Sequence, residues 1–225
     1  MVKEFSKILI ATSSEEKVRE YKQLFSDVEG VEFVTLNDVF GDNLPEDPEE
    51  NGKTFMDNAM LKAKYWSEKS GLPALADDSG ICVDALDGFP GVRSKRFCKS
   101  YDDPKFNDKF HNQELLNILH TKGFTESMAS YECAIVLYNA EIGRYYHAYG
   151  CCKGKYSDKY STGHNGFAFD NHFWAEAYNY TKTLADISTN EKNKISHRGL
   201  AVKELKENMK LNKVYVVFGG EEENA

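Results

Sequence analysis

The sequence lacks any long hydrophobic run. Its first apolar stretch, 8–11, is only four residues long, which is too short for a secretory core or a membrane span. Cysteine is also scarce: five residues, an odd number with no Cys-x-x-Cys spacing, argue against a disulfide framework or a thiolate metal site. We therefore expect a cytoplasmic protein with reduced thiols and no membrane contact.

Positive charge is in deficit as well. The 28 Lys and Arg residues face 36 Asp and Glu residues, which gives a formal net charge of −8. A protein that wraps long nucleic acid needs a broad basic surface, so we expect no such partner. A small anionic ligand would instead need a local pocket of Lys and Arg within acidic surroundings.

Internal repeats and low-complexity tracts are absent too, and helical and strand-like patterns alternate along the chain. With 225 residues, 41% of them hydrophobic, the chain can bury one sizeable core. We therefore expect a single α/β domain over 1–225. The spacing predicts strands over 7–11, 72–76, 81–86, 131–138, 145–149 and 214–218, and helices around 18–25, 54–71, 107–119 and 196–209.

Two adjacent acids, Asp77 and Asp78, follow the apolar run 72–76. Carboxylates held close together repel each other, and a divalent cation relieves that repulsion; Mg²⁺ takes both carboxylate and phosphate oxygens as ligands. The Asp-Asp-Ser-Gly run is equally typical of a tight turn between two strands. Both interpretations stay open at this point.

Two charged residues upstream could complete such a site. Glu50 lies in an acidic loop, 42–52, that Pro45 and Pro48 interrupt, and Lys62 lies on the helix that follows. A solvated acidic run before a helix and a surface lysine are the commoner explanations. These two residues become informative only in combination with the other candidates.

A polar loop near the N-terminus offers a place for phosphate. Thr12, Ser13 and Ser14 precede a helix whose first turn carries Lys17, and a helix N-terminus with a nearby cation favours anions. The spacing of a P-loop is missing, and a serine before a helix is more often only its cap.

A basic cluster near the C-terminus could complement that loop. Lys192, Ser196, His197 and Arg198 surround a helix start and supply donors suited to phosphate or to a base carbonyl. A helix cap with ordinary surface charge remains the plainer interpretation. Upstream, the aromatic residues Phe167 and Phe169 precede Asp170 and could stack on a base, although aromatic strands usually pack in a core.

Taken together, these segments resemble the inosine triphosphate pyrophosphatase family over nearly the whole chain. The opening strand and loop 7–17 match its phosphate loop, and 54–64 matches its Thr-Phe-x-x-Asn-Ala-x-x-Lys-Ala helix. The central block 71–94 contains Ala-Asp-Asp-Ser-Gly and Pro-Gly-Val. Near the C-terminus, Glu-Lys-Asn is followed by Ser-His-Arg at 196–198.

The resemblance implies an elongated mixed sheet flanked by helices, with two lobes and a central nucleotide-binding cleft. It also implies a homodimer that hydrolyses the triphosphates of inosine, deoxyinosine and xanthosine to monophosphate and pyrophosphate, with Mg²⁺ as cofactor. Asp78 and Lys62 would be catalytic; Glu50 and Asp78 would hold the metal, with Asp77 nearby. The implied substrate-binding residues are Thr12, Ser14, Lys17, Ser79, Phe167, Phe169, Asp170, Lys192, His197 and Arg198.

Two places depart from the family pattern. Ser14 stands where the family has Asn, and Ala168 with Phe169 replaces Gly followed by Tyr or Trp. Ser14 loses an amide donor, and Ala168 restricts positive φ. The same chemistry on a different nucleotide, and a nucleotide-binding protein without catalysis, therefore stay open. The acidic strand end alone also suggests a phosphomonoesterase with an aspartyl nucleophile, which would release orthophosphate, although the Asp-x-Asp pattern is missing.

Overall fold

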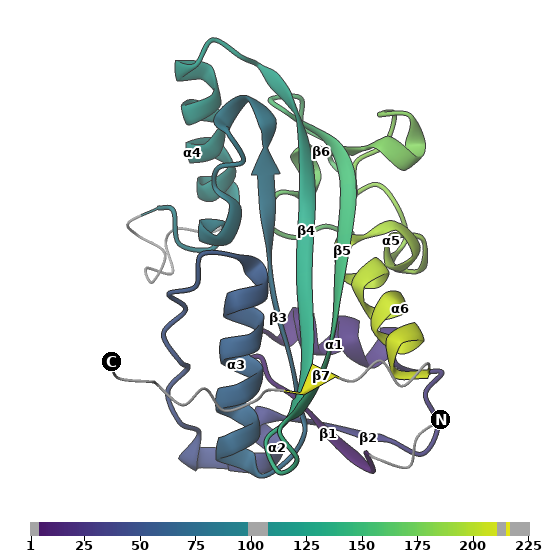
Figure 1. Ribbon diagram of the computed structural model, residues 1–225. Coiled ribbons are helices and arrows are strands. Elements are labelled where there is room, and N and C mark those ends of the chain that lie inside the picture. Colours follow the sequence, from purple (N-terminus) through teal and green to yellow (C-terminus); the bar gives the residue numbers. More distant parts are fainter. Residues whose placement is uncertain (1–4, 99–107, 211–214, 217–225) are drawn as a thin grey trace, which may run out of the picture. The chain divides into compact units, whose positions relative to one another are not determined.

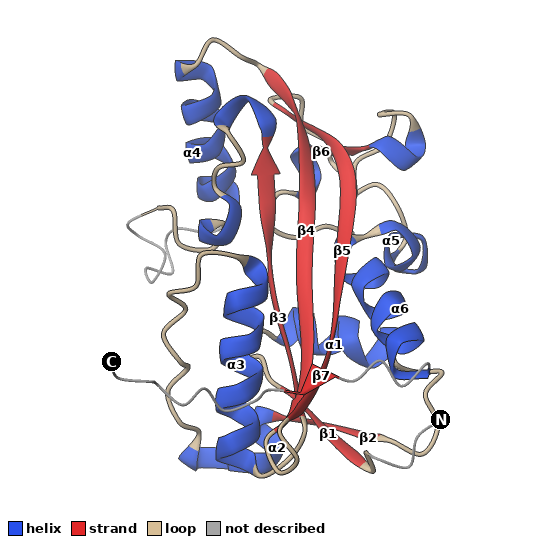
Figure 2. Ribbon diagram, viewed as in Figure 1, coloured by secondary structure: helices blue, strands red, loops and turns tan. Residues whose placement is uncertain are grey.

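The computed structural model describes residues 5–98, 108–210 and 215–216. Its strands form one mixed sheet in the order β2-β1-β3-β4-β5-β6, with β7 paired to β5, so the predicted α/β class is confirmed. The strands (Figure 2) are β1 (Lys7–Ile10), β2 (Glu32–Thr35), β3 (Ala74–Val83), β4 (Glu126–Asn139), β5 (Arg144–Ser157), β6 (Phe173–Ala175) and β7 (Tyr215–Val216). The helices (Figure 1) are α1 (Glu15–Leu24), α2 (Leu36–Phe40), α3 (Phe55–Ser70), α4 (Asp108–Thr121), α5 (Thr189–Ile195) and α6 (His197–Lys210).

The chain divides into two compact units. Unit 1 comprises Met1–Asp78, Ala134–Ala148 and Val202–Ala225, and unit 2 comprises Ser79–Cys133 and Tyr149–Ala201. The strands β3, β4 and β5 and the helix α6 each contribute residues to both units. Asp78 is thus the last residue of one unit, and Ser79 is the first residue of the other.

In unit 1, β1 pairs in parallel with both β2 and β3. The helix α3 starts and stops where its sequence predicts. Thr54 Oγ1 accepts a hydrogen bond from the Asp57 amide, and the Thr54 amide donates one to the Asp57 carboxylate in a capping box. Gly71 ends the helix at φ 70°, a left-handed conformation that glycine adopts without strain. The buried side chains Ala59, Ala63 and Trp66 form its inner face.

In unit 2, the core gathers side chains from the strands and from α4. Leu115 and Leu119 of α4 are fully buried and belong to one cluster with Ile81, Tyr156 and Phe173. Leu119 follows Leu116 by three residues and Leu115 by four, which gives α4 its buried stripe. The expected helix at 107–119 is therefore confirmed over its described part, while residue 107 lies outside the described residues.

The structure corrects one expectation about the central motif. The Asp-Asp-Ser-Gly run forms no turn, because β3 continues unbroken from Ala74 to Val83. Ser94 stabilises this straight path: its hydroxyl accepts a bond from the Ile81 amide at 2.9 Å and donates one to the Gly91 carbonyl at 2.7 Å. Turn propensity is a local average, and tertiary hydrogen bonds have overridden it here.

The strand expected at 7–11 is confirmed as β1, whereas two other strand predictions are confirmed in place but were too short. The paired strands expected at 131–138 and 145–149 extend to Glu126–Asn139 and Arg144–Ser157. Buried residues alternate with more exposed ones along most of β5 and in the first half of β4, as expected for a sheet with one covered face, whereas residues 133–139 of β4 are all buried. The expected C-terminal strand 214–218 is described only at Tyr215–Val216; its other residues lie outside the described part.

Candidate functional site

Unit 1 contains five of the predicted charged residues in close contact, which we call the acid–lysine group: Lys17, Glu50, Lys62, Asp77 and Asp78. The Lys62 ammonium lies 3.1 Å from Glu50 Oε1 and 3.8 Å from Asp78 Oδ1. Lys17 from α1 donates to Asp77 Oδ2 at 2.9 Å. The structure therefore brings these widely separated sequence positions together as ion pairs.

The two adjacent acids take different lysines because of strand geometry. Successive side chains of a strand point to opposite faces of the sheet. Asp77 accordingly pairs with Lys17, whereas Asp78 contacts Lys62 of α3. Asp77 is still close enough to contribute to the electrostatic environment of Lys62.

Burial makes these charges depend on one another. For Lys62, burial favours the neutral amine, but the charges of Asp78, Asp77 and Glu50 outweigh it and raise its pKa. For Asp78, burial is the largest influence and raises its pKa, against the lowering effects of Lys62 and of a hydrogen bond from Asn58. The acid–lysine group thus holds a partly desolvated carboxylate next to a fully charged ammonium.

Asn58 is a contact of this group to which the sequence interpretation gave no role of its own. Its side chain is fully buried, and its Nδ2 donates to Asp78 Oδ2 at 2.8 Å. Its Oδ1 accepts from the Gly52 amide at 2.8 Å. An Asn on the apolar face of a helix was the available signal, because a buried amide must find partners.

The predicted phosphate loop lies between β1 and α1. Ser14 caps α1, since its Oγ accepts a bond from the Lys17 amide at 3.3 Å. Thr12 Oγ1 in turn accepts from the Ser14 amide at 3.3 Å. The cap interpretation of Ser14 is therefore confirmed. The cap also sets the first turn of α1, which carries Lys17.

Unit 2 contains the other candidates, which we call the arginine–aromatic group: Ser79, Phe167, Asp170, Lys192, His197 and Arg198. Arg198 is 2% exposed, and its Nη2 donates to Ser79 Oγ at 3.1 Å. Ser196 caps α6 through a bond from the Gly199 amide at 3.1 Å. The cap places His197 and Arg198 in the first turn of that helix.

Lys192 and Asp170 connect α5 to the aromatic loop. The Lys192 ammonium lies 2.6 Å from Asp170 Oδ2 and 5.7 Å from the centre of the Phe167 ring. Asp170 also accepts from the Phe167 amide at 2.8 Å. Phe167 is 41% exposed, so its ring presents a surface on which a planar base could stack.

The structure treats the two predicted stacking residues differently. Phe169 is only 5% exposed and belongs to the core cluster, where its ring packs against Phe97 and Tyr156. Ala168, between them, has φ 56°, a conformation unusual for a residue with a Cβ. The ring exposed for ligand contact is therefore that of Phe167.

Tyr131 is a further residue that sequence reasoning missed. Its ring is stacked on His197, with centroids 4.8 Å apart and planes 10° apart. Its hydroxyl accepts from the Phe169 amide at 3.2 Å. Tyr131 therefore supports both the start of α6 and the aromatic loop. Its strand pattern predicted only a core position.

The acid–lysine group suits a small hard cation. Glu50 and Asp78 both lie within 4 Å of a single ammonium, so their oxygens already surround a positive charge. Among the described residues, no three His, Cys, Asp or Glu side chains converge as a ready-made metal cage. Mg²⁺ needs no such cage, since it is usually held by one or two carboxylates together with substrate phosphates and water.

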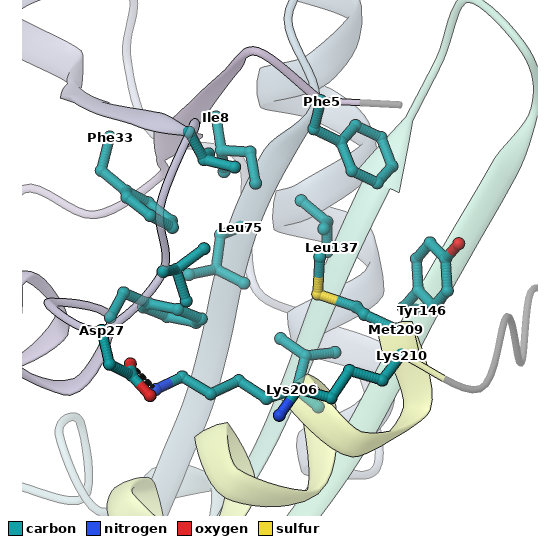
Figure 3. A pocket seen from close by; sticks show the side chains of 14 residues that line it. Phe5, Ile8, Asp27, Phe33, Leu75, Leu137, Tyr146, Lys206, Met209 and Lys210 are labelled. Carbon is teal, nitrogen blue, oxygen red and sulfur yellow. Dashed lines mark hydrogen bonds and ion pairs between the residues drawn. The ribbon is translucent and has the colours of Figure 1, made fainter. Parts of the chain in front are cut away.

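An apolar pocket lies elsewhere in unit 1. Figure 3 shows Ile8, Leu75 and Leu137 lining it, with Lys206 and Asp27 paired at its edge. None of its lining residues is in the acid–lysine group. The charged candidates are therefore the better guide to chemistry than this cavity.

Known proteins resemble this chain along most of its length. The model of the Ham1 family matches residues 8–208, a span that includes every candidate residue. A dITP/XTP pyrophosphatase of Campylobacter jejuni is 40% identical over 198 residues, covering 85% of this chain and 91% of that protein. One from Elusimicrobium minutum is 40% identical over 207 residues, covering 91% and 100%. A solved HAM1 protein from Coxiella burnetii has a TM-score of 0.77 at 32% identity and covers 91% of this chain and 98% of that chain.

Proposed function

Because the chain belongs to the Ham1 family, we propose that it hydrolyses nonstandard purine nucleoside triphosphates to the monophosphate and pyrophosphate. The substrates would be the triphosphates of inosine, deoxyinosine and xanthosine, in keeping with the dITP/XTP pyrophosphatase name of its relatives. The observation that carries the proposal is the contact of Lys62 with both Glu50 and Asp78. It unites a helix, a loop and a strand in one charged group.

The acid–lysine group would act on the triphosphate. Lys17 and Lys62 would offset phosphate charge, and Asp78 would orient or deprotonate the attacking water. Glu50 and Asp78 would hold Mg²⁺, with Asp77 nearby; when bound, the ion neutralises charge developing on the phosphate oxygens. Thr12 and Ser14 would line the phosphate loop.

The arginine–aromatic group would select the base. Phe167 would stack on the purine, and Lys192 and Asp170 would lie beside it. His197 and Arg198 would donate to the 6-oxygen of a deaminated purine. The 6-amino group of adenine would meet the Arg198 guanidinium donor to donor, which disfavours adenosine triphosphate.

A product assay tests this function directly. Inosine triphosphate is incubated with the protein, with and without Mg²⁺, and pyrophosphate and orthophosphate are measured separately. We expect equal amounts of pyrophosphate and inosine monophosphate, formed only with Mg²⁺. Orthophosphate as the product would instead support the phosphomonoesterase alternative, and nucleotide binding without turnover would support a protein that has lost catalysis.

A different nucleotide preference is the second candidate, favoured by Ala168 at φ 56° and by the buried Phe169. Both lie in the loop that would contact the base. A panel of inosine, xanthosine and the four common triphosphates measures kcat/KM for each. If the common nucleotides are turned over as fast as the deaminated ones, the proposed preference for deaminated purines is wrong, while hydrolysis to monophosphate and pyrophosphate still holds.

The assembly and the cellular setting are further parts of the proposal. The family resemblance implies a homodimer, which light scattering of the purified protein measures. All five cysteines are free thiols, which fits a reducing, cytoplasmic environment. Within the described residues, no helix has the length and apolar composition that a membrane span requires.

A further inference from the structure

We propose that Asn58 is a positioning residue that fixes the geometry between the Glu50 loop and Asp78 for metal binding. The inference rests on the proposed function, because it concerns the two carboxylates that would hold Mg²⁺. It goes further by assigning a task to a side chain that touches neither substrate nor metal in the proposed mechanism.

First, the side-chain amide of Asn58 makes two hydrogen bonds, one through its nitrogen and one through its oxygen. Asn58 donates from Nδ2 to Asp78 Oδ2 at 2.8 Å and accepts at Oδ1 from the Gly52 amide at 2.8 Å. Gly52 lies two residues after Glu50. A single rigid side chain therefore connects the loop that carries one carboxylate to the strand that carries the other.

The second step is the assignment of the Asp78 oxygens. Asn58 and Lys62 are four residues apart on α3, so they share one face of that helix. Asn58 occupies Oδ2, whereas the Lys62 ammonium lies 3.8 Å from Oδ1. Oδ1 is therefore the oxygen left toward the Lys62 ammonium, which also contacts Glu50, and the bond from Asn58 opposes rotation of the carboxylate.

The third step is the tightness of the contact. Asn58 is 0% exposed, so water cannot replace either of its bonds. At Gly52, an added Cβ would lie 2.5 Å from Asn58 Oδ1, which shows how closely the loop backbone approaches the amide. Partners in the second coordination sphere that are held this way commonly affect metal affinity by about 10–100-fold when removed.

The test compares Asn58→Leu and Asn58→Ala with a matched control, Ser67→Ala. Leucine keeps the branched outline of the Asn58 side chain, is somewhat larger and loses both bonds, while alanine guards against a folding defect caused by the larger residue. Ser67 lies on the same helix, is 1% exposed, donates to the Leu72 carbonyl at 2.7 Å and accepts from the Ala140 amide at 2.9 Å. It therefore controls for the loss of two buried bonds outside the acid–lysine group.

Mn²⁺ binding is the decisive measurement because it needs no turnover. Free Mn²⁺ is titrated by electron paramagnetic resonance, first with each protein alone and then with a non-hydrolysable inosine triphosphate analogue, and thermal unfolding is recorded in parallel. We expect the Asn58 variants to bind Mn²⁺ about 10–100-fold more weakly than the wild type. The Ser67→Ala protein should bind as the wild type does, even where its Tm falls.

Steady-state kinetics provide a second readout. The Asn58 variants should need more Mg²⁺ for half-maximal rate, whereas Ser67→Ala should need the same concentration as the wild type. If a folded Asn58 variant binds Mn²⁺ as tightly as Ser67→Ala, Asn58 is only a structural residue and the inference is wrong. Wild-type protein that binds no Mn²⁺ in either titration also overturns it. If Mn²⁺ binds as expected but no pyrophosphate is released, only the proposed function fails.

Discussion

The acid–lysine group and the arginine–aromatic group differ in the chemistry of their contacts. In the first, each lysine of the group contacts a carboxylate, and the contacts are those of compact charges. In the second, recognition elements are planar and directional: the Arg198 guanidinium bonded to Ser79, and the Phe167 ring beside Lys192. Compact charges suit phosphates and a metal, which every nucleotide shares, whereas planar donors and rings distinguish one base from another. The difference predicts that catalysis and selectivity can be damaged separately.

The substitution Asp78→Asn should have the largest effect. The amide would keep the size of the side chain but could neither accept a proton nor carry the charge for Mg²⁺, so we expect kcat to fall by about 10³-fold or more. Thermal unfolding should show that the protein still folds. A variant with near-normal pyrophosphate release would remove Asp78 from the mechanism and break the proposed division of tasks.

Replacing Lys62 with Met should have the second-largest effect on activity. We expect kcat for inosine triphosphate to fall about 10²-fold, and the protein to lose stability because Glu50 and Asp78 are left facing each other with no intervening cation. Lys64→Met is the control, since Lys64 is exposed on the same helix. Selectivity between inosine and adenosine triphosphates should stay as in the wild type. A large change in that ratio would contradict the separation of the two groups.

Replacing Arg198 with Leu tests the proposed role of the arginine–aromatic group in selecting the base. The variant should lose about 10–100-fold in the ratio of kcat/KM for inosine over adenosine triphosphate, the size expected for a hydrogen bond to a charged group. The value of kcat/KM should fall mainly for inosine triphosphate and little for adenosine triphosphate. Equal losses for both nucleotides would instead place Arg198 at the phosphates.

The dependence of folding stability on pH should come from His172 and not from His164, although both lie in unit 2. Burial lowers the pKa of His172 below its usual value, opposed by the contact of Nδ1 with the Ser157 carbonyl at 2.8 Å. The unfolded chain therefore takes up the proton first as pH falls through about 6.5, and stability should decline from there until the folded pKa is reached. His172→Gln should flatten the decline in chemical denaturation, while the exposed His164→Gln should leave it unchanged.

The smallest effect is expected at Ala168. Glycine at this position would relieve the left-handed φ of 56°, worth about 1–2 kcal/mol, but it would add conformational entropy to the unfolded chain, which costs about 0.5–1 kcal/mol. We expect Ala168→Gly to raise stability by roughly 0–1 kcal/mol. Denaturant unfolding measures this change in the free energy of unfolding. A clear loss of stability would mean that the methyl group contributes packing that outweighs the strain.

The sequence predicted which residues belong to the two groups better than it predicted how those residues contact one another. Lys17, Lys62, Asp78 and Arg198 could be named in advance because charged residues near strand ends and helix starts are informative when several occur in a family-like order. The contacts between them could not be predicted, because Lys62 and Asp78 meet only after β3 pairs in the sheet and α3 packs. The straight path of β3 through Asp-Asp-Ser-Gly was missed for the same reason, since Ser94 and the lysines act on it from distant positions.

The sequence by itself determined where α3 begins and ends, at Thr54 and Gly71, because capping bonds and left-handed termination involve only neighbouring residues. Only the tertiary structure decided that Asn58 would meet Asp78, that Phe169 would be buried and Phe167 exposed, and that Tyr131 would stack on His197. Those outcomes depend on which face of each strand is covered, and that is settled by long-range packing rather than by local propensity.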